Sequence, residues 1–252
     1  MTSKSDRGLI LRTKLLIPER VWRIATRPAS WVLGALPEQL KYKMGLRARK
    51  ASIPYSLIET DDVVVQIGAP ADLLKVGRSR SAYFMNLVSG NGKLVVMEPD
   101  SDNCRAMEAY GARNGFSDRL IVVNAGAWSS DTTLSFYESK KHPASAVMVE
   151  LSEATPEEMR RRGYHRVDVP VTTVDKVFAE HALPLPKVIS ITTNGAELEI
   201  LHGMSDLLAK GGPEYISLAV TGDRYAESMV EFGYEYLGDD DRGFTFRRVA
   251  NS

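Results

Sequence analysis

The sequence predicts an α/β fold built on a doubly wound, largely parallel sheet. Two short runs of β-branched and apolar residues, 63–67 and 94–97, end at Gly68 and at Glu98, and such runs are typical of buried strands. Between them, residues 82–88 place aromatic and aliphatic side chains at helical spacing before a Gly-Asn-Gly stop signal. Strand, crossover helix and strand form a βαβ unit, so these two strands should be parallel.

The rest of the chain continues this alternation of strands and helices. Further strands are expected at 120–123, 187–191 and 215–220, and a tight polar loop joins 234–237 to 244–247 in what should be an antiparallel hairpin. The result is a seven-stranded sheet with a mixed edge, and no repeat or linker indicates a second independent domain. Between the third and fourth strands, the alternating residues 132–137 are expected to pair with 127–129 as a hairpin, and 167–171 is also strand-like.

Charge is unevenly distributed along the 252 residues. Residues 1–50 hold 12 Lys and Arg against 3 Asp and Glu, a net charge of +9, although the whole chain is formally neutral. We therefore divide the chain into a basic, helical N-terminal extension, residues 1–60, and an α/β domain, residues 61–252. The extension combines arginines with tryptophans and aliphatic residues. This pattern fits a helix packed on the domain or, alternatively, an interfacial helix in peripheral contact with a membrane.

Composition narrows the setting and the partners. Cys104 is the only cysteine, which excludes an internal disulfide and a multi-cysteine metal site and favours a reducing, cytoplasmic compartment. No apolar run is long enough to span a bilayer or to serve as a signal peptide. We expect no metal site. Nucleic acid is not an expected partner either, because basic and aromatic residues interleave only in the N-terminal arm.

The carboxyl ends of the predicted strands carry the candidate binding residues. Gly68 would let the backbone approach a ligand closely, and Glu98 could accept two hydrogen bonds from a ribose diol, so the pair suggests a nucleoside ligand. An ordinary α/β turn with a solvated acid is the competing interpretation. The residues around Asn124, after the third strand, could meet a flat base or form a turn. In the polar segment after Gly68, Arg78 and Arg80 could meet an anion, but a solvated loop is the default expectation.

Four motifs in a fixed order resemble the FkbM family of S-adenosylmethionine-dependent methyltransferases. They are VMEPDSDN at 96–103, NGFSDRLIVVNAGAW at 114–128, VPVTTVDKV before the fourth strand, and VISITTNGAELEILHGM at 188–204. The resemblance covers about residues 63–208. It implies a Rossmann-like methyltransferase sheet that binds S-adenosylmethionine and methylates a hydroxyl of a small-molecule or glycan substrate, namely a sugar, a lipid-linked compound or a natural product.

The resemblance also implies roles for individual residues. Gly68 would lie under the methionine part of the donor, Glu98 would hold its ribose, and Asn124 would lie near its adenine. The acceptor would sit over Thr192 and Asn194. Glu197 would be the catalytic base or an acceptor that orients the substrate, and its alternative role is that of a first-turn acid stabilising a helix dipole.

The sequence departs from the family pattern at two places. Gln66 replaces an acidic residue before the first glycine, and Pro70 follows where a further glycine is usual. Where the family typically has aspartate and glutamate, this chain has Thr192 and Asn194, which cannot take a proton and bind a divalent metal poorly. Two hypotheses therefore stand: an active O-methyltransferase, and a methyltransferase-like binding or scaffold protein that has lost catalysis.

Overall fold

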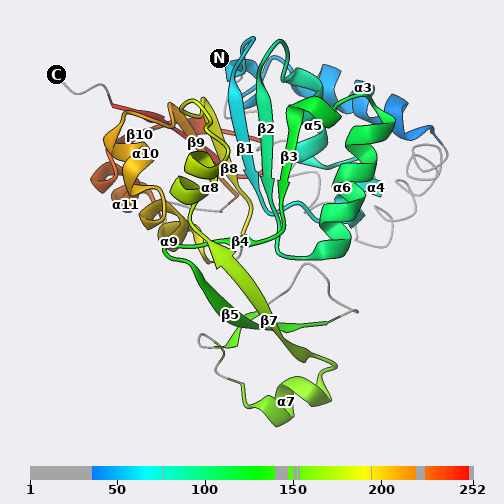
Figure 1. Ribbon diagram of the computed structural model, residues 1–252, viewed down its shortest axis with the longest axis vertical. Helices are drawn as coiled ribbons and strands as arrows, with labels where there is room; N and C mark the ends of the chain where they lie inside the picture. Colours follow the sequence, from blue (N-terminus) through cyan, green and yellow to red (C-terminus); the bar gives the residue numbers. More distant parts are fainter. Residues whose placement is uncertain are drawn as a thin grey trace, which may run out of the picture.

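A computed structural model describes residues 36–75, 77–139, 147–149, 152, 154–193, 195–219 and 225–249. Its centre is a seven-stranded sheet in the order β10-β11-β9-β8-β1-β2-β3 (Figure 1). Numbered along the chain within this sheet, the order is 3-2-1-4-5-7-6. The strands are β1 (Val63–Ile67), β2 (Lys93–Met97), β3 (Leu120–Val123), β8 (Val188–Ile191), β9 (Tyr215–Leu218), β10 (Tyr234–Asp239) and β11 (Phe244–Arg248). The predicted sheet and its antiparallel hairpin are confirmed, because β1, β2, β3, β8 and β9 are parallel and β11 is antiparallel to both neighbours.

Helices cover both faces of this sheet, as a doubly wound fold requires (Figure 1). One side carries α3 (Glu38–Arg49), the short η1 (Tyr55–Leu57), α4 (Ala71–Lys75), α5 (Arg80–Leu87) and α6 (Ser101–Arg113), with η2 (Ser117–Arg119) leading into β3. The other side carries α8 (Val174–Glu180), α9 (Glu197–His202), α10 (Ser205–Ala209) and α11 (Ala226–Glu231). The chain thus forms three layers, helix, sheet and helix.

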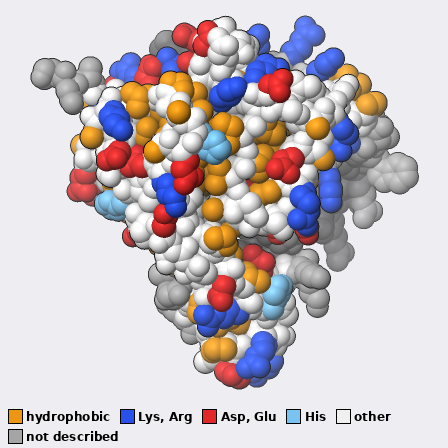
Figure 2. All heavy atoms as spheres, in the orientation of Figure 1, with side chains coloured by type: hydrophobic (Ala, Val, Ile, Leu, Met, Phe, Trp, Pro, Cys, Tyr) orange, Lys and Arg blue, Asp and Glu red, His pale blue; other side chains and the backbone are white. Residues whose placement is uncertain are grey.

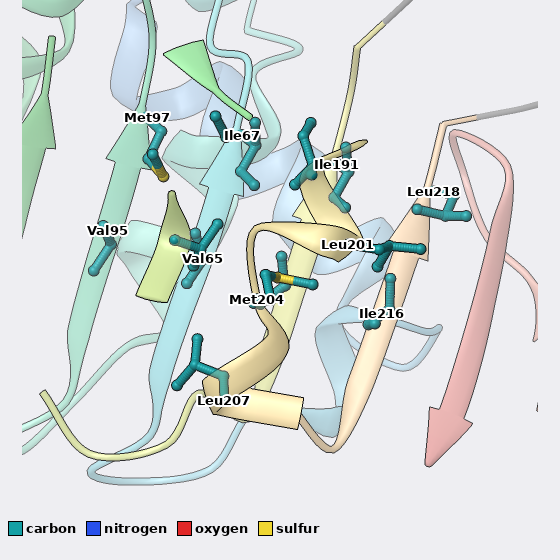
Figure 3. Close-up of a cluster of buried hydrophobic side chains, with 14 of the residues drawn as sticks. Val65, Ile67, Val95, Met97, Ile191, Leu201, Met204, Leu207, Ile216 and Leu218 are labelled. Atoms are coloured by element: carbon teal, nitrogen blue, oxygen red, sulfur yellow. The ribbon is translucent and has the colours of Figure 1, made fainter. Parts of the chain in front are cut away.

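Alternation along the strands divides the core between the two faces. Val65 and Ile67 of β1 pack with α8–α11, and Figure 3 shows Leu201 and Met204 lying against the strands on this side. Val64 of β1 instead joins Phe84 of α5 in the cluster on the opposite face. Continuously apolar strands are expected where a sheet is covered on both sides.

A second sheet, which the sequence did not predict as such, projects from one end of the first (Figure 1). Its order is β4-β7-β5-β6, with β4 (Gly126–Ala127), β5 (Thr132–Glu138), β6 (Val147–Met148) and β7 (His165–Thr172). The predicted hairpin between 127–129 and 132–137 is wrong, because β7 lies between β4 and β5 and pairs with β5 along its whole length. β4 has only two residues and could form few hydrogen bonds with β5. β7 is the better partner for β5, because the two strands share seven register pairs and a matching alternation of apolar and polar side chains.

The outer end of the second sheet carries α7 (Pro156–Arg161). A capping box starts this helix, with Thr155 accepting from the Glu158 amide and the Glu158 side chain accepting from the Thr155 amide. Figure 2 shows basic and acidic side chains together at this tip. The tip is thus a charged, mixed surface.

The described part of the N-terminal extension packs on the sheet domain. Tyr42 of α3 is buried and stacks edge to face on Tyr83 and Tyr110, with ring centroids 5.6 and 5.1 Å away. Tyr55 of η1 is buried in the same cluster. The predicted amphipathic arm itself falls on residues 1–35, outside the described residues. Within the described part of the chain, no helix is both long and apolar enough to cross a membrane.

Candidate functional site

A cavity of about 720 Å³ lies between the carboxyl ends of the main strands and the second sheet. This is the size of a small-molecule site, at the edge where open α/β sheets bind ligands. Its main-sheet side includes Gln66, Gly68, Ala69, Ser79, Arg80, Glu98, Asn103, Thr192, Thr193 and Gly195, and Arg242 also borders it. The second-sheet side includes Ala127, Trp128, Leu134, Phe136, Val169 and Val171.

Gly68 forms the turn at the end of β1 and borders the cavity, and its close approach to a ligand stays a prediction. Its φ is +80°, and a Cβ at this position would lie 2.7 Å from the Thr192 carbonyl oxygen and 3.0 Å from Thr192 Oγ1. Both the backbone conformation and the space therefore require glycine. The turn can pack this closely against Thr192 only because residue 68 has no side chain.

Glu98 lies at the carboxyl end of β2 and borders the cavity, although it is only 6% exposed. Its Oε2 accepts a hydrogen bond from the Ala69 amide at 2.6 Å, and its Oε1 accepts from the Asp100 amide and from Asn103 Nδ2, both at 3.1 Å. Burial raises the pKa of the carboxyl above its ordinary value, although these three hydrogen bonds act in the opposite direction. The carboxylate is thus held rigidly across the Gly68 turn, where it can accept further hydrogen bonds.

Gln66 and Thr192 lock the same turn from the side. Gln66 Nε2 donates to the carbonyl oxygens of Ile67 and Gly68 at 3.0 and 2.9 Å and to Thr192 Oγ1 at 2.9 Å. The Thr192 hydroxyl also lies 2.9 Å from both carbonyl oxygens. Thr192 borders the cavity, but its hydroxyl is engaged with β1, and its contact with the acceptor stays a prediction. Asn194, the second predicted acceptor-binding residue, lies outside the described residues.

Glu197, the predicted catalytic residue, is 1% exposed and is not among the residues that line the cavity. One of its oxygens accepts from Thr193 Oγ1 at 3.0 Å and from the Gly195 amide at 3.4 Å, and the other accepts from Tyr225 OH at 2.9 Å. Glu197 thus holds Thr193 and Gly195, which border the cavity, and it lies in the first turn of α9, as its alternative role as a helix-dipole acid requires. Orientation of a substrate by Glu197 stays a prediction. Its role as a base stays a prediction.

Asn124 hydrogen-bonds to the end of β2 and is not among the residues that line the cavity. Its Nδ2 donates to the carbonyl oxygens of Pro99 and Glu98 at 2.9 and 3.2 Å and contacts Cys104 Sγ at 3.4 Å. Asn124 thereby supports the strand end that carries Glu98. Its predicted position near an adenine stays a prediction. Cys104 beside it is buried, and burial raises the pKa of its thiol to about 11, so the thiol is not a nucleophile at neutral pH.

Arg80 corrects the expectation of a solvated loop after Gly68. It is 3% exposed, and its Nη2 contacts Asp240 Oδ1 at 2.8 Å and Asp241 Oδ1 at 2.6 Å in the loop between β10 and β11. Burial alone would raise the pKa of Asp240, but Arg80 and three further hydrogen bonds hold that pKa below its ordinary value. The default expectation is therefore wrong for Arg80, which pairs with two carboxylates far along the chain. Their pairing could not be inferred from the sequence, but three consecutive aspartates, 239–241, were a visible signal.

The apolar wall of the cavity is the part of the site that sequence reasoning missed. Leu134 of β5 is paired in register with Val169 of β7, so both point to the same face of the second sheet. On the opposite face, Ser135 donates to Asp168 at 2.6 Å and accepts from Arg166 at 2.7 Å. The alternation of these side chains is visible in the sequence, but only the pairing of β5 with β7 shows that the apolar face borders a cavity.

A seven-stranded sheet of this order, with a glycine turn and an acidic residue at the carboxyl ends of its first two strands, is a Rossmann-like methyltransferase fold. Residues 66–246, well over half of the chain, match the methyltransferase FkbM domain family. The chain belongs to this family, which confirms the resemblance noted in its motifs.

Two solved structures that match this chain are distant from it in sequence. Methyltransferase FkbM from Methylobacillus flagellatus is 13% identical with a TM-score of 0.49, over 90% of this chain and 59% of that one. Fibrillarin from Aeropyrum pernix, with natively bound S-adenosylmethionine, is 12% identical with a TM-score of 0.44, over 82% of this chain and 74% of that one. The chain thus spans about three fifths of the FkbM structure. No curated protein matches it.

Proposed function

We propose that the chain binds S-adenosylmethionine and transfers its methyl group to a hydroxyl of a sugar, a lipid-linked compound or a natural product. The observation that carries this proposal is the pairing of Gly68 with Glu98 beneath one cavity. A buried carboxylate at the end of β2 suits a ribose diol, and the Cβ-free turn beside it suits close approach of the donor. Family membership supports the same donor.

The residues present fit this donor, which supplies an electrophilic methyl group on a sulfonium. Glu98 would accept from the ribose, and Gly68 would leave room for the chain between ribose and amino acid. Such a reaction depends mainly on alignment of donor and acceptor, which the rigid hydrogen bonds of this turn provide. The apolar second-sheet wall would cover the acceptor and exclude water. Because this wall is apolar, it suits a hydroxylated acceptor with an apolar body better than it suits a sugar alone.

One observation favours the second hypothesis, a binding protein without catalysis. Among the described residues that line the cavity, Glu98 is the single carboxylate, and no histidine is present. Transfer to a hydroxyl benefits from a base that takes its proton. Glu98 is assigned to the donor, and Glu197 is engaged with Thr193, Gly195 and Tyr225. The base for an active enzyme must then come from the substrate, from solvent or from another part of the chain.

A methyl-transfer assay distinguishes the two hypotheses. Purified full-length protein is incubated with methyl-labelled S-adenosylmethionine and with acceptors of the three classes, and label in the extracted acceptor is counted. We expect transfer to a hydroxylated apolar acceptor, its loss in Glu98→Ala, and normal rates in Thr133→Ala on the outward face of β5. Donor binding without transfer to any acceptor class would support the binding protein. Absence of donor binding would contradict the proposed methyl transfer and would favour the scaffold protein.

A further inference from the structure

The helix α3 presents two faces of different character. Its inner face packs on the domain, because Tyr42 is buried and Gly45 lies against the Tyr83 ring. On the other side, Leu40 and Met44 are four residues apart, so they lie on one face of the helix. Leu40 is 42% exposed and Met44 is 51% exposed, although both are large apolar side chains. The fold therefore leaves an apolar pair on the outside of α3.

Basic residues surround this apolar pair. We define the outer face of α3 by the large apolar and basic residues at this helical spacing, which are Leu40, Lys43, Met44, Arg47 and Lys50. Lys43, Arg47 and Lys50 are exposed, and none of them forms an ion pair with a residue that the structure describes. The outer face thus combines two apolar side chains with three cations.

Two other charges of α3 are paired within the fold. Glu38 is the single acid of the helix, and its Oε2 lies 3.5 Å from Arg113 Nη2. Arg49, on the inner side, contacts Asp241 Oδ2 through its Nε at 3.0 Å. Since the helix offers no further acid, the three cations of the outer face leave it with a net charge of +3.

The chemistry of the outer face indicates which partner covers it. Anionic lipids suit it, because apolar side chains can enter the boundary of a bilayer while the cations beside them meet the headgroups. Single-stranded nucleic acid would call for aromatic side chains on which bases stack, and the outer face has none. Residues 1–35 hold 7 Lys and Arg against 2 Asp and Glu, a net charge of +5, so they carry the same sign as the outer face. A second copy of this face would be repelled for the same reason.

We propose that the outer face of α3 docks the protein on a membrane that contains anionic lipids. Leu40 and Met44 enter the interface, and Lys43, Arg47 and Lys50 contact the headgroups. Residues 1–35 directly precede this helix, so their positive charge adds to the attraction. Docking does not depend on methyl transfer.

The position of α3 connects docking with the cavity. Arg49 pairs with Asp241, and Tyr42 OH donates to the Leu74 carbonyl oxygen. Residues 73 and 242, the direct neighbours of these two partners, line the cavity. A docked α3 therefore lies beside two segments that border the site. This consequence, unlike docking itself, rests on the proposed function, and it favours the lipid-linked compound among the three acceptor classes.

Co-sedimentation of the full chain with vesicles tests the proposal without a methyl donor. Vesicles of phosphatidylcholine alone are compared with vesicles that also contain phosphatidylserine. We expect binding to the anionic vesicles only, and a decline as salt is raised, because salt screens the attraction between exposed charges. Replacing two cations, Lys43→Gln with Arg47→Gln, should weaken binding about thirtyfold, which corresponds to about 2 kcal/mol. The matched control is Arg161→Gln with Arg162→Gln, which removes the same charge from exposed positions at the end of α7 and should bind as the natural protein does.

A second pair of variants tests the apolar part of the outer face. Leu40→Ser with Met44→Ser should weaken binding to the anionic vesicles about tenfold. Val230→Ser is the control, because Val230 of α11 is 67% exposed and lies outside the outer face, and it should change nothing.

Several results would overturn the proposal. Equal vesicle binding by the natural protein and by Lys43→Gln with Arg47→Gln would assign docking to another part of the chain. Equal binding to both kinds of vesicle, or binding to neither, would exclude an anionic membrane as the partner. In the absence of vesicle binding, a band shift of single-stranded RNA that the same double variant loses would make the outer face a nucleic-acid site. None of these results bears on donor binding, so the proposed function would stand or fall separately.

Discussion

The two walls of the cavity are built in opposite ways. The main-sheet floor is polar and rigid, because Gln66, Glu98 and Arg80 are buried and held by hydrogen bonds or ion pairs. The second-sheet wall presents Leu134, Val169 and similar side chains. A floor with fixed polar groups can define the position of one constant ligand, whereas an apolar wall provides area without a strict pattern. The difference supports our proposal that the floor binds the donor and that the wall binds the acceptor.

Removing the charge that anchors the floor should have the largest effect. Arg80→Ala leaves the buried Asp240 without its ion-pair partner, and breaking such a buried pair costs about 3–5 kcal/mol of unfolding free energy. Urea denaturation followed by circular dichroism measures the loss. Arg160→Ala on α7 removes an exposed pair with Glu157 and should cost less than about 1 kcal/mol. Similar losses in the two variants would show that the floor is not anchored by charge.

A second variant tests whether the floor depends on the Gly68 turn. Gly68→Ala places a side chain at a positive φ and puts its Cβ 2.7 Å from the Thr192 carbonyl oxygen. We expect this overpacking to lower the free energy of unfolding by about 1–3 kcal/mol, in addition to the cost of the backbone strain. Affinity for S-adenosylhomocysteine should fall about tenfold or more. Gly115→Ala is the matched control, because Gly115 has a φ of +74° but nothing within 4 Å of its Cβ position. It should cost about 1 kcal/mol and leave affinity unchanged. Equal losses of affinity would rule out a special role for the Gly68 turn.

The buried carboxylate of the floor should make donor binding depend on pH. Because burial raises the pKa of Glu98 above 4.5, its acceptor oxygens are lost to protonation at a higher pH than for an exposed glutamate. Affinity for S-adenosylhomocysteine should therefore decline as pH falls through this raised pKa. The same shift means that Glu98 favours the folded state when protonated and reduces stability as pH rises through that pKa. Calorimetry across pH measures the decline, and Glu98→Gln should abolish it. A decline that persists in Glu98→Gln would assign the effect to another group.

Changes in the apolar wall should have the smallest effect on the affinity for the donor. Phe136→Ala removes part of the wall, so the KM for the acceptor should rise while affinity for S-adenosylhomocysteine stays within about twofold. Thr133→Ala, on the other face of β5, should change neither. Steady-state kinetics with one acceptor gives the KM, and calorimetry with S-adenosylhomocysteine gives the affinity. A large loss of donor affinity in Phe136→Ala would mean that the wall belongs to the donor site.

The contrast between the walls also explains how much could be predicted from the sequence. The main sheet was predicted because each of its strands is a local apolar run that ends at a glycine or a polar residue, such as Gly68 or Glu98. Parallel βαβ units then allow few topologies. The second sheet was missed because β4, β5 and β7 pair across insertions, and register between distant strands is not a local property. Arg80 was assigned to a loop by default, since its partners at 240 and 241 come from the far hairpin.

Calorimetry of the full chain with S-adenosylhomocysteine tests the central claim most directly. If the floor is a donor site, the natural protein should bind with micromolar affinity, and Glu98→Ala should weaken binding about tenfold or more because the ribose loses its acceptor. Thr133→Ala should bind as the natural protein does. Equal affinity in the natural protein and in Glu98→Ala, or no heat of binding at millimolar ligand, would contradict the assignment of the main-sheet floor to the methyl donor.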